Sequence, residues 1–168
     1  MNERIILSFP GGGTRFNFRV AGAAIRDGHV LVCREDKDDY CMLPGGRVEM
    51  GEATDVALLR EMAEELAMPV DMGALLFTYE SFYGRAGDRF HELGFVYAIA
   101  LPEDVLPGGE QPFLVREDEG HLLQFSWLPL EGQALSDASL QPPWLAERLA
   151  SLGNQQQHVI FNALEPVA

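Results

Sequence analysis

Residues 46–68, with the sequence GRVEMGEATDVALLREMAEELAM, decide the fold of this 168-residue chain. From about residue 53 to residue 66, apolar residues recur at the spacing of an amphipathic helix. Each helical residue turns by about 100°, so Glu65 falls about 40° to one side of Glu61 and Glu64 about 60° to the other. The stretch therefore predicts a helix with three carboxylates on one narrow face.

An apolar stripe on this helix, roughly 100° to 220° away from Glu61, predicts the face that packs on a sheet. The core residues that we expect in and near the helix are Met50, Val56, Leu59, Met62, Ala63 and Leu66. The carboxylates then point away from the core and repel one another by about a few tenths of a kcal/mol per pair. Such a charge run is usually only a solvated face, but a divalent cation would also offset the repulsion, since Mg²⁺ prefers oxygen ligands.

The residues around the carboxylates favour the metal over the solvated face. The spacing is a glycine (Gly46), five residues, a glutamate (Glu52), seven residues, and then REMAEELAM at 60–68. This pattern closely resembles the Nudix box. It departs once, at Ala67, where the family has a glycine, and an alanine there costs about 1 kcal/mol if its φ is positive.

The resemblance implies both a fold and a metal site. The fold is α/β, a Nudix-type α/β/α sandwich with a mixed β-sheet flanked by helices. The implied ligands of Mg²⁺, for which Mn²⁺ can substitute, are Glu61, Glu64, Glu65 and the carbonyl of Gly45. The three glutamates are also the candidate catalytic residues, with Glu61 a candidate base. The implied support residues, which brace the loop against the helix, are Gly46, Glu52 and Arg60.

Relatives of this kind often recruit one more acid from a distant loop, and the polar segment before HLLQFSWLPL offers three candidates. Among Glu117, Asp118 and Glu119 we favour Glu119 as a metal ligand. Glu92 is a rival, because a carboxylate within an apolar strand must be paired, hydrated or bound to metal if it is buried. For each of these four acids, the default interpretation is a carboxylate that is exposed to solvent or paired in a salt bridge. His91 is a candidate base, although a hydrogen-bonded strand histidine is the simpler interpretation.

Two arginines are candidates for binding substrate phosphate. Arg47 directly follows the glycines, and Arg19 lies in the first core strand. Ordinary surface ion pairing explains them equally well. Aromatic residues in strands can stack on a base but mostly fill the core, so none stands out as a base reader among Phe16, Phe18, Tyr40, Phe82, Tyr83 and Phe90.

The order of apolar runs and turn signals predicts one domain of strands and helices. We expect strands at 16–25, 29–35, 73–83, 90–101 and 121–130, a polar loop at 107–120, a helix at 142–152, and a strand or loop at 158–164. Glycine-containing turns, Asp27-Gly28 and GRAGDR, predict two hairpins. The predicted divisions are a leader arm at 1–14, a hydrolase domain at 15–155 with its box at 46–68, and a C-terminal extension at 156–168.

The net charge of −14 opposes non-specific attraction to duplex nucleic acid and to anionic membranes. No secretion signal and no apolar run of about 20 residues is visible, so we expect a cytoplasmic protein that does not insert into membranes. Two cysteines, Cys33 and Cys41, fit neither a zinc spacing nor a disulfide framework and are expected to be buried in strands.

The resemblance implies Mg²⁺-dependent hydrolysis of a diphosphate linkage in a nucleoside diphosphate joined to another moiety. The partner is therefore a small molecule, and a homodimer is compatible with this hypothesis. Nucleoside triphosphates, nucleotide sugars, ADP-ribose and dinucleoside polyphosphates all stay open as substrates. Two alternatives are a catalytically inactive nucleotide sensor and an isoprenyl-diphosphate isomerase, for which neither cysteine is well placed.

Overall fold

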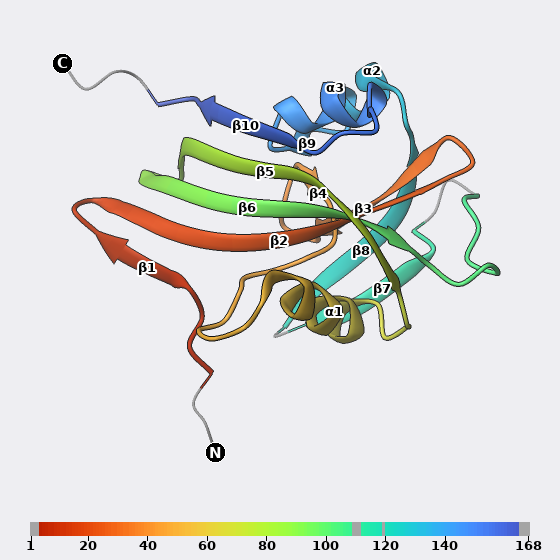
Figure 1. Ribbon diagram of the computed structural model, residues 1–168, viewed down its shortest axis with the longest axis horizontal. Coiled ribbons are helices and arrows are strands. Elements are labelled where there is room, and N and C mark those ends of the chain that lie inside the picture. Colours follow the sequence, from red (N-terminus) through yellow and green to blue (C-terminus); the bar gives the residue numbers. More distant parts are fainter. Residues whose placement is uncertain (1–3, 109–111, 119, 165–168) are drawn as a thin grey trace.

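The computed structural model describes residues 4–108, 112–118 and 120–164. Figure 1 shows α1 (Thr54–Glu65) on one side of the strands, with α2 (Gly132–Asp137) and α3 (Trp144–Ala150) on the other. Both faces of the sheet are thus covered by helices. The predicted α/β/α sandwich with a mixed sheet is confirmed.

The strands of the described residues form one hydrogen-bonded sheet along the path β10-β5-β6-β2-β3-β4-β9, with β1 added to β2, and β7 joined through β8 to β3. Pairing is parallel for β2 with β6, β5 with β10 and β4 with β9, and antiparallel for the other pairs. The strand bounds are β1 Ser8–Gly11, β2 Thr14–Arg26, β3 His29–Glu35, β4 Cys41–Met42, β5 Asp71–Arg85, β6 Asp88–Ala100, β7 Leu114–Asp118, β8 His121–Pro129, β9 Leu140–Gln141 and β10 Gln157–Asn162.

Two tight turns form where the sequence predicts hairpins. Asp27 and Gly28 have φ of 47° and 70° between β2 and β3, and Ala86 and Gly87 have φ of 52° and 89° between β5 and β6. Two consecutive positive φ angles match the right-handed twist of the flanking strands. Both hairpins are confirmed.

The buried face of α1 differs from the predicted one. Val56 and Leu59 are 54% and 42% exposed, and Met50 just before the helix is 63% exposed. The buried side chains of the helix are those of Ala57, Leu58 and Met62, followed by Leu66 at its end. The predicted stripe is confirmed at Met62 and Leu66 and wrong at Val56, Leu59 and exposed Ala63. Apolar residues occur on both sides of α1, and only contact with the sheet selects one of them.

Successive side chains of β2 alternate between two apolar clusters, one on each face of the sheet. Val20 and Ala24 pack with α1, Leu31 and Phe125. Ala23, on the opposite face, packs in the second cluster with residues of α2 and α3, among them Leu135, Leu145 and Leu149. The cysteines divide in the same way, since buried Cys33 lies on the α1 side and buried Cys41 on the other. Their predicted burial in strands is confirmed.

The predicted polar loop at 107–120 contains a strand. In β7, Leu114 pairs opposite Phe125 and Arg116 opposite Leu123 of β8. Exposed Val115 and Glu117 alternate with half-buried Leu114 and Arg116, which is compatible with an edge strand exposed on one face. Segment 107–120 is therefore a loop only in part, and the short helix α2 was not predicted.

Both ends of the described chain join the sheet. In the leader arm, β1 forms a hairpin with β2 through Gly12 and Gly13, which have φ of 58° and 76°. At the other end, β10 pairs with β5 in parallel and buries Val159. The uncertain segment at 158–164 is thus mostly strand. The predicted divisions at 14/15 and 155/156 stay predictions.

Among the described residues, no helix combines the length and apolarity required to cross a membrane.

Candidate active site

Residues 44–48 run beside β2 and hold the glycines of the box close to α1. Backbone bonds join the amides of Gly22 and Val20 to the carbonyls of Pro44 and Gly46, both at 2.9 Å. A side chain at Gly45 would overlap the β2 backbone at Val20 and Ala21. Glycine is therefore required here for close approach of two backbones.

The backbone of Gly45 lies between an acidic and a basic side chain. Its amide donates to Glu65 Oε2 at 3.2 Å, and its carbonyl accepts from Arg19 Nη2 at 3.4 Å. Glu65 comes from α1 and Arg19 from β2, so residues that lie far apart in sequence meet at Gly45, on the two peptide groups that flank its Cα. A backbone carbonyl and a carboxylate thus lie together where the resemblance implies a metal.

The carboxylate of Glu61 packs directly against Gly46. A Cβ added at Gly46 would overlap the carboxylate carbon and both of its oxygens. The Glu61 side chain is only 14% exposed. Contrary to the sequence expectation, this acid is turned toward the loop and the sheet instead of away from them.

Arg60 joins the acids of the box to one another. Its guanidinium donates to Glu52 at 2.8 and 2.9 Å and to the carbonyl of Arg47 at 3.1 Å. The same side chain donates through Nη1 to Glu61 at 2.7 Å and to Glu64 at 3.2 Å. Arg60 therefore offsets part of the repulsion between the acids while it ties the loop to the helix.

These contacts perturb the titration of the acids. Burial raises the pKa of Glu61 above its usual range, because desolvation outweighs the opposing effect of Arg60. Hydrogen bonds from Arg60 lower the pKa of Glu52. Of the three helix acids Glu61, Glu64 and Glu65, Glu64 is the most exposed, with a side chain 47% exposed. Glu64 also forms an ion pair with Arg4 at 3.2 Å.

The donor set fits a hard divalent cation. Glu61 supplies carboxylate oxygens against Gly46 and Glu65 against the amide of Gly45, and the absence of a Cβ at Gly46 is what lets the Glu61 carboxylate approach the backbone. Mg²⁺ binds oxygen ligands of this kind and keeps waters that a phosphate can replace. Arg60 is held by Glu52 and by a carbonyl, so the second oxygen of Glu61 stays available beside Gly46.

Arg19 and Arg47 lie together, since their backbones form a bridge between β2 and the glycine loop. Burial disfavours the charged form of Arg19, but the carboxylates of Glu92 and Glu65 and the hydroxyls of Tyr79 and Tyr83 together outweigh it, so the pKa of Arg19 is raised. Burial and the neighbouring Arg19 lower the pKa of Arg47. Both arginines line a cavity of about 550 Å³ on the sheet face opposite α1.

Glu92 lies in this cavity and not beside the helix acids. It is 6% exposed and accepts hydrogen bonds from the hydroxyls of Tyr79 at 2.9 Å and Tyr83 at 3.2 Å. A buried carboxylate needs such partners. Among the options left open by the sequence, Glu92 is therefore a paired acid in the cavity, with Arg19 as its nearby counter-charge.

The remaining predicted residues are dispersed. His91 stacks on Phe82 at 4.5 Å and meets Phe16 edge-on at 5.4 Å. Glu117 is exposed in β7, and Asp118 ends that strand. Glu119, the favoured extra ligand, lies outside the described residues.

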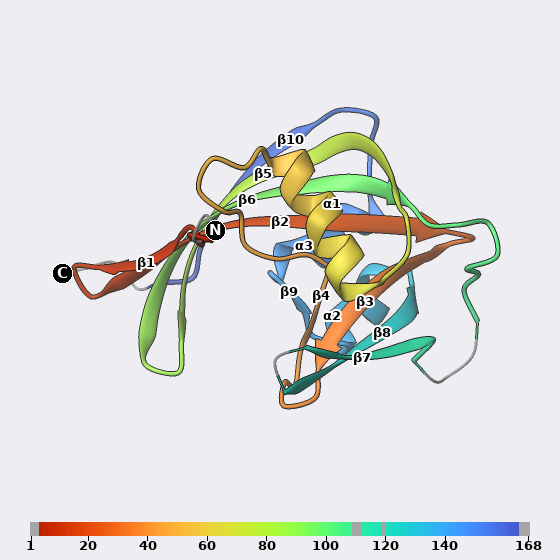
Figure 2. The same ribbon diagram turned by 90° about the horizontal axis from the view of Figure 1, so that it is seen from below.

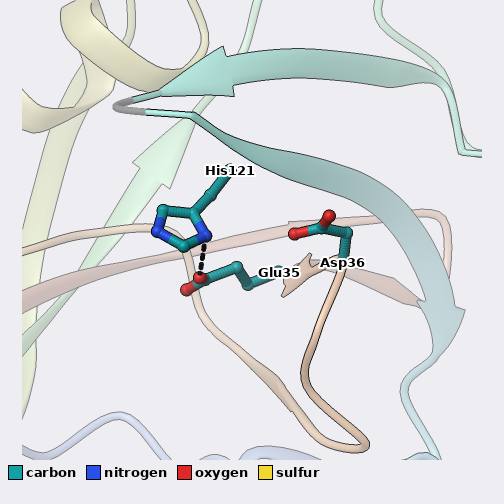
Figure 3. Close-up of side chains that lie close together, drawn as sticks. All are labelled: Glu35, Asp36 and His121. Atoms are coloured by element: carbon teal, nitrogen blue, oxygen red, sulfur yellow. Dashed lines mark ion pairs between the residues drawn. The ribbon is translucent and has the colours of Figure 1, made fainter.

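A second group of potential metal ligands lies at the end of β3. Figure 3 shows Glu35, Asp36 and His121 side by side, with Glu35 Oε1 2.9 Å from His121 Nδ1. The ammonium group of Lys37 is 3.3 Å from the same Nδ1. A positive charge at this position opposes cation binding, so the group is best described as a partly exposed ion pair.

Sequence reasoning did not find the cavity. Its walls include Asp38, Tyr40, Arg85 and Trp144, which come from the loop between β3 and β4, the tip of a hairpin and α3. Arg19, Arg47 and the burial argument for Glu92 pointed to this face in advance, and three of the aromatics that the sequence left unranked, Tyr40, Tyr83 and Phe90, also line the cavity.

A family model described as NUDIX domain matches residues 17–147. The chain belongs to the Nudix family. No curated protein matches it significantly. The match covers α1, the glycine loop and the cavity lining except Phe161 and Ala163.

Solved structures with this Nudix fold share little sequence with the chain. A mutator MutT protein from Bacillus halodurans superposes with a TM-score of 0.61 at 16% identity, covering 87% of this chain and 89% of that one. A UDP-X diphosphatase gives 0.58 at 18%, covering 85% of this chain and 66% of the other. An ADP-ribose pyrophosphatase from Streptococcus suis gives 0.52 at 15%, covering 86% and 98%. At these identities the likeness shows the fold alone.

Proposed function

We propose that this Nudix protein hydrolyses a diphosphate linkage in a nucleoside diphosphate derivative, with Mg²⁺ held by Glu61, Glu64, Glu65 and the carbonyl of Gly45. The observation that carries the proposal is the meeting of Glu61 with Gly46 and of Glu65 with Gly45. Carboxylates and a carbonyl at one place form a ligand set for a hard cation. The bound cation would lower the pKa of a water and neutralise phosphate charge.

The residues around the metal ligands divide the remaining tasks. Arg60 and Glu52 hold the glycine loop against α1, so the acids meet the loop in a fixed geometry. Arg19 and Arg47, on the other side of the Gly45 peptide, offer guanidinium donors to the phosphates. Glu61 serves as the candidate base for the attacking water, since its carboxylate lies against Gly46 at the proposed metal site.

An inactive nucleotide sensor is less well supported than an enzyme, because the acids of the box are all present and meet the loop. An isoprenyl-diphosphate isomerase would use a reactive cysteine. Here burial raises the pKa of both Cys33 and Cys41, which disfavours their thiolates. A cytoplasmic location and a homodimer agree with the proposal without being required by it.

The test measures the cleavage of nucleoside triphosphates, nucleotide sugars, ADP-ribose and dinucleoside polyphosphates in Mg²⁺, by chromatographic detection of the two phosphorylated products that form when water breaks the diphosphate linkage. We expect Glu61→Gln and Glu65→Gln each to lower kcat/KM by about 100-fold or more, because a catalytic metal contributes several kcal/mol of transition-state stabilisation. Circular dichroism and thermal melting check that the variants fold.

Glu147→Gln is the matched control, since Glu147 is an exposed helical glutamate on α3 outside the cavity. It should keep parental activity. Equal activity of the parent and both α1 variants would remove the assigned site. Tight binding of a nucleotide that the parent never cleaves would favour the sensor.

A further inference from the structure

The described part of the leader arm runs beside the Nudix box before it joins the sheet. The amide of Met50 donates to the carbonyl of Ile5 at 2.7 Å, and Ile6 forms an antiparallel bridge with Glu49. The arm therefore lies next to the loop that leads into α1, on the same side of the molecule as that helix (Figure 2). These backbone contacts hold the preceding residue, Arg4, against the box.

The side chain of Arg4 reaches two acids of this region. Its Nε donates to Glu49, and its Nη1 donates to Glu64 Oε1 at 3.2 Å. The other oxygen of Glu64, Oε2, accepts from Arg60 Nη1 at 3.2 Å. Both oxygens of one candidate metal ligand thus already face a guanidinium group.

Two guanidinium groups at Glu64 oppose the binding of a cation there. A divalent cation has the same sign of charge as Arg4 and Arg60, and like charges a few ångströms apart repel each other. A carboxylate whose charge is shared with two arginines also attracts a cation less strongly than a solvated one. Glu64 therefore becomes a stronger metal ligand when one of the two arginines moves away.

The contacts of the two arginines decide which one moves. Arg60 is 20% exposed, donates twice to Glu52 and donates once more to the carbonyl of Arg47. Arg4 is 58% exposed, and its second partner, Glu49, is an acid of the box segment with a side chain only 16% exposed. Because the Arg4 side chain is long and exposed, it can turn from Glu64 and keep Glu49. Arg4 is thus the arginine that a cation displaces at the lower cost.

We propose that Arg4 competes with the divalent cation for Glu64, so that the leader arm lowers the metal affinity of the site. The inference rests on the proposed function for the role of Glu64 as a ligand, and it deepens that function by making the arm a regulator of metal binding. An exposed ion pair corresponds to a factor of about two to five in an equilibrium. By linkage, a bound cation weakens the contact between Arg4 and Glu64 by the same factor.

The test measures Mn²⁺ binding without substrate, from the electron paramagnetic resonance signal of free Mn²⁺ at constant ionic strength. Arg4→Gln should tighten the strongest Mn²⁺ site by about two- to fivefold, because a neutral amide does not compete with a cation. Arg148→Gln removes one positive charge from α3, on the other side of the sheet, and is the matched control. It should bind Mn²⁺ like the parent, and thermal melting checks that each variant folds.

Glu64→Gln separates competition for Glu64 from a general loss of positive charge. Alone, this variant should weaken Mn²⁺ binding. Adding Arg4→Gln to it should then change the affinity by less than about 1.5-fold, because the group for which Arg4 competes is gone. If Arg4→Gln tightens binding equally in both backgrounds, Arg4 acts through its charge alone and the proposal is overturned.

The proposal also fails if Arg4→Gln binds Mn²⁺ like the parent or more weakly, if Glu64→Gln binds Mn²⁺ like the parent, or if the parent binds no Mn²⁺ at millimolar concentration. Weaker binding by Arg4→Gln would mean that Arg4 orients Glu64 for the metal. Since no substrate is present, a protein that binds Mn²⁺ but cleaves no diphosphate can pass this test. An active hydrolase whose Mn²⁺ affinity ignores Arg4→Gln fails it, so the two failures are distinguishable.

Discussion

Ala67 ends α1 in a conformation that suits glycine better. Its φ is 51°, in the left-handed region, and the last helical bond runs from Leu66 N to the carbonyl of Met62 at 2.9 Å. From the sequence, an alanine in place of the glycine of the box is expected to cost stability if its φ is positive, and φ is positive here. The chain thus carries a small strain next to the acids, while the acids themselves keep their contacts.

Replacing this alanine should relieve the strain. We expect Ala67→Gly to raise the free energy of unfolding by about 1 kcal/mol, because glycine adopts positive φ without a steric penalty. Ala63→Gly, at an exposed position inside α1, is the control and should lower it by about 0.5–1 kcal/mol. Urea unfolding of the parent and the two variants gives both changes in the free energy of unfolding. A lower free energy of unfolding for Ala67→Gly as well as for Ala63→Gly would show that Ala67 is not strained.

The orientation of α1 decides what its acids can do. Relative to Glu61, the buried side chain of Leu58 stands at about 60° and Glu65 at about 40°, while exposed Val56 and Leu59 stand at about 220° and 160°. The acids therefore lie on the edge of the packed face, against the glycine loop. Had the predicted stripe been buried, the carboxylates would have pointed into solvent without the carbonyl of Gly45.

The contact between helix and loop can be tested by adding one methyl group. We expect Gly46→Ala to displace the Glu61 carboxylate and lower activity about tenfold or more, as changes around metal ligands commonly do. Global stability should change by less than about 1 kcal/mol, since the displaced atoms end a flexible side chain and Gly46 has no positive φ. Steady-state kinetics and urea unfolding measure the two effects.

Gly108→Ala is the control for that experiment, because a Cβ there meets nothing within 4 Å and its φ is not positive. It should leave activity unchanged. Full activity of a folded Gly46→Ala protein would separate Glu61 from the reaction.

At the scale of the whole molecule, the most prominent property is the net negative charge. The formal net charge is −14, from 26 acids against 12 lysines and arginines. Among the described residues, arginine ion pairs gather at Arg60, Arg4 and Arg85. A net charge of this size destabilises the compact state through self-repulsion. Salt screens such repulsion, with a Debye length of about 10 Å at 0.1 M.

The melting temperature should therefore rise with added salt. Between about 0.01 and 0.15 M NaCl we expect a rise of about 2–4 °C, which corresponds to about 1 kcal/mol for a protein of this size. Thermal melting followed by circular dichroism measures it, and NaCl is used because Mg²⁺ would also stabilise by binding. A fall would mean that local ion pairs outweigh the overall repulsion.

The sequence by itself determined the elements that depend on local spacing. Residues 46–68 predicted the helix, the Nudix box and the candidate metal acids, because a helix repeats within a few residues and the box is contiguous. The hairpins at Asp27-Gly28 and Ala86-Gly87 were equally local, since their turns need positive φ at adjacent positions. These features required no knowledge of which strands pair.

Only the tertiary structure decided which face of α1 is buried and where the cavity lies. The parallel pairing of β2 with β6 brings Asn17 opposite Glu92, and the antiparallel pairing of β5 with β6 brings Ser81 opposite the same residue. Arg19, Glu92, Tyr40 and Arg85 therefore reach one space from four separate segments. No local pattern encodes such a meeting, because it depends on strand register and on how the loops fold back over the sheet.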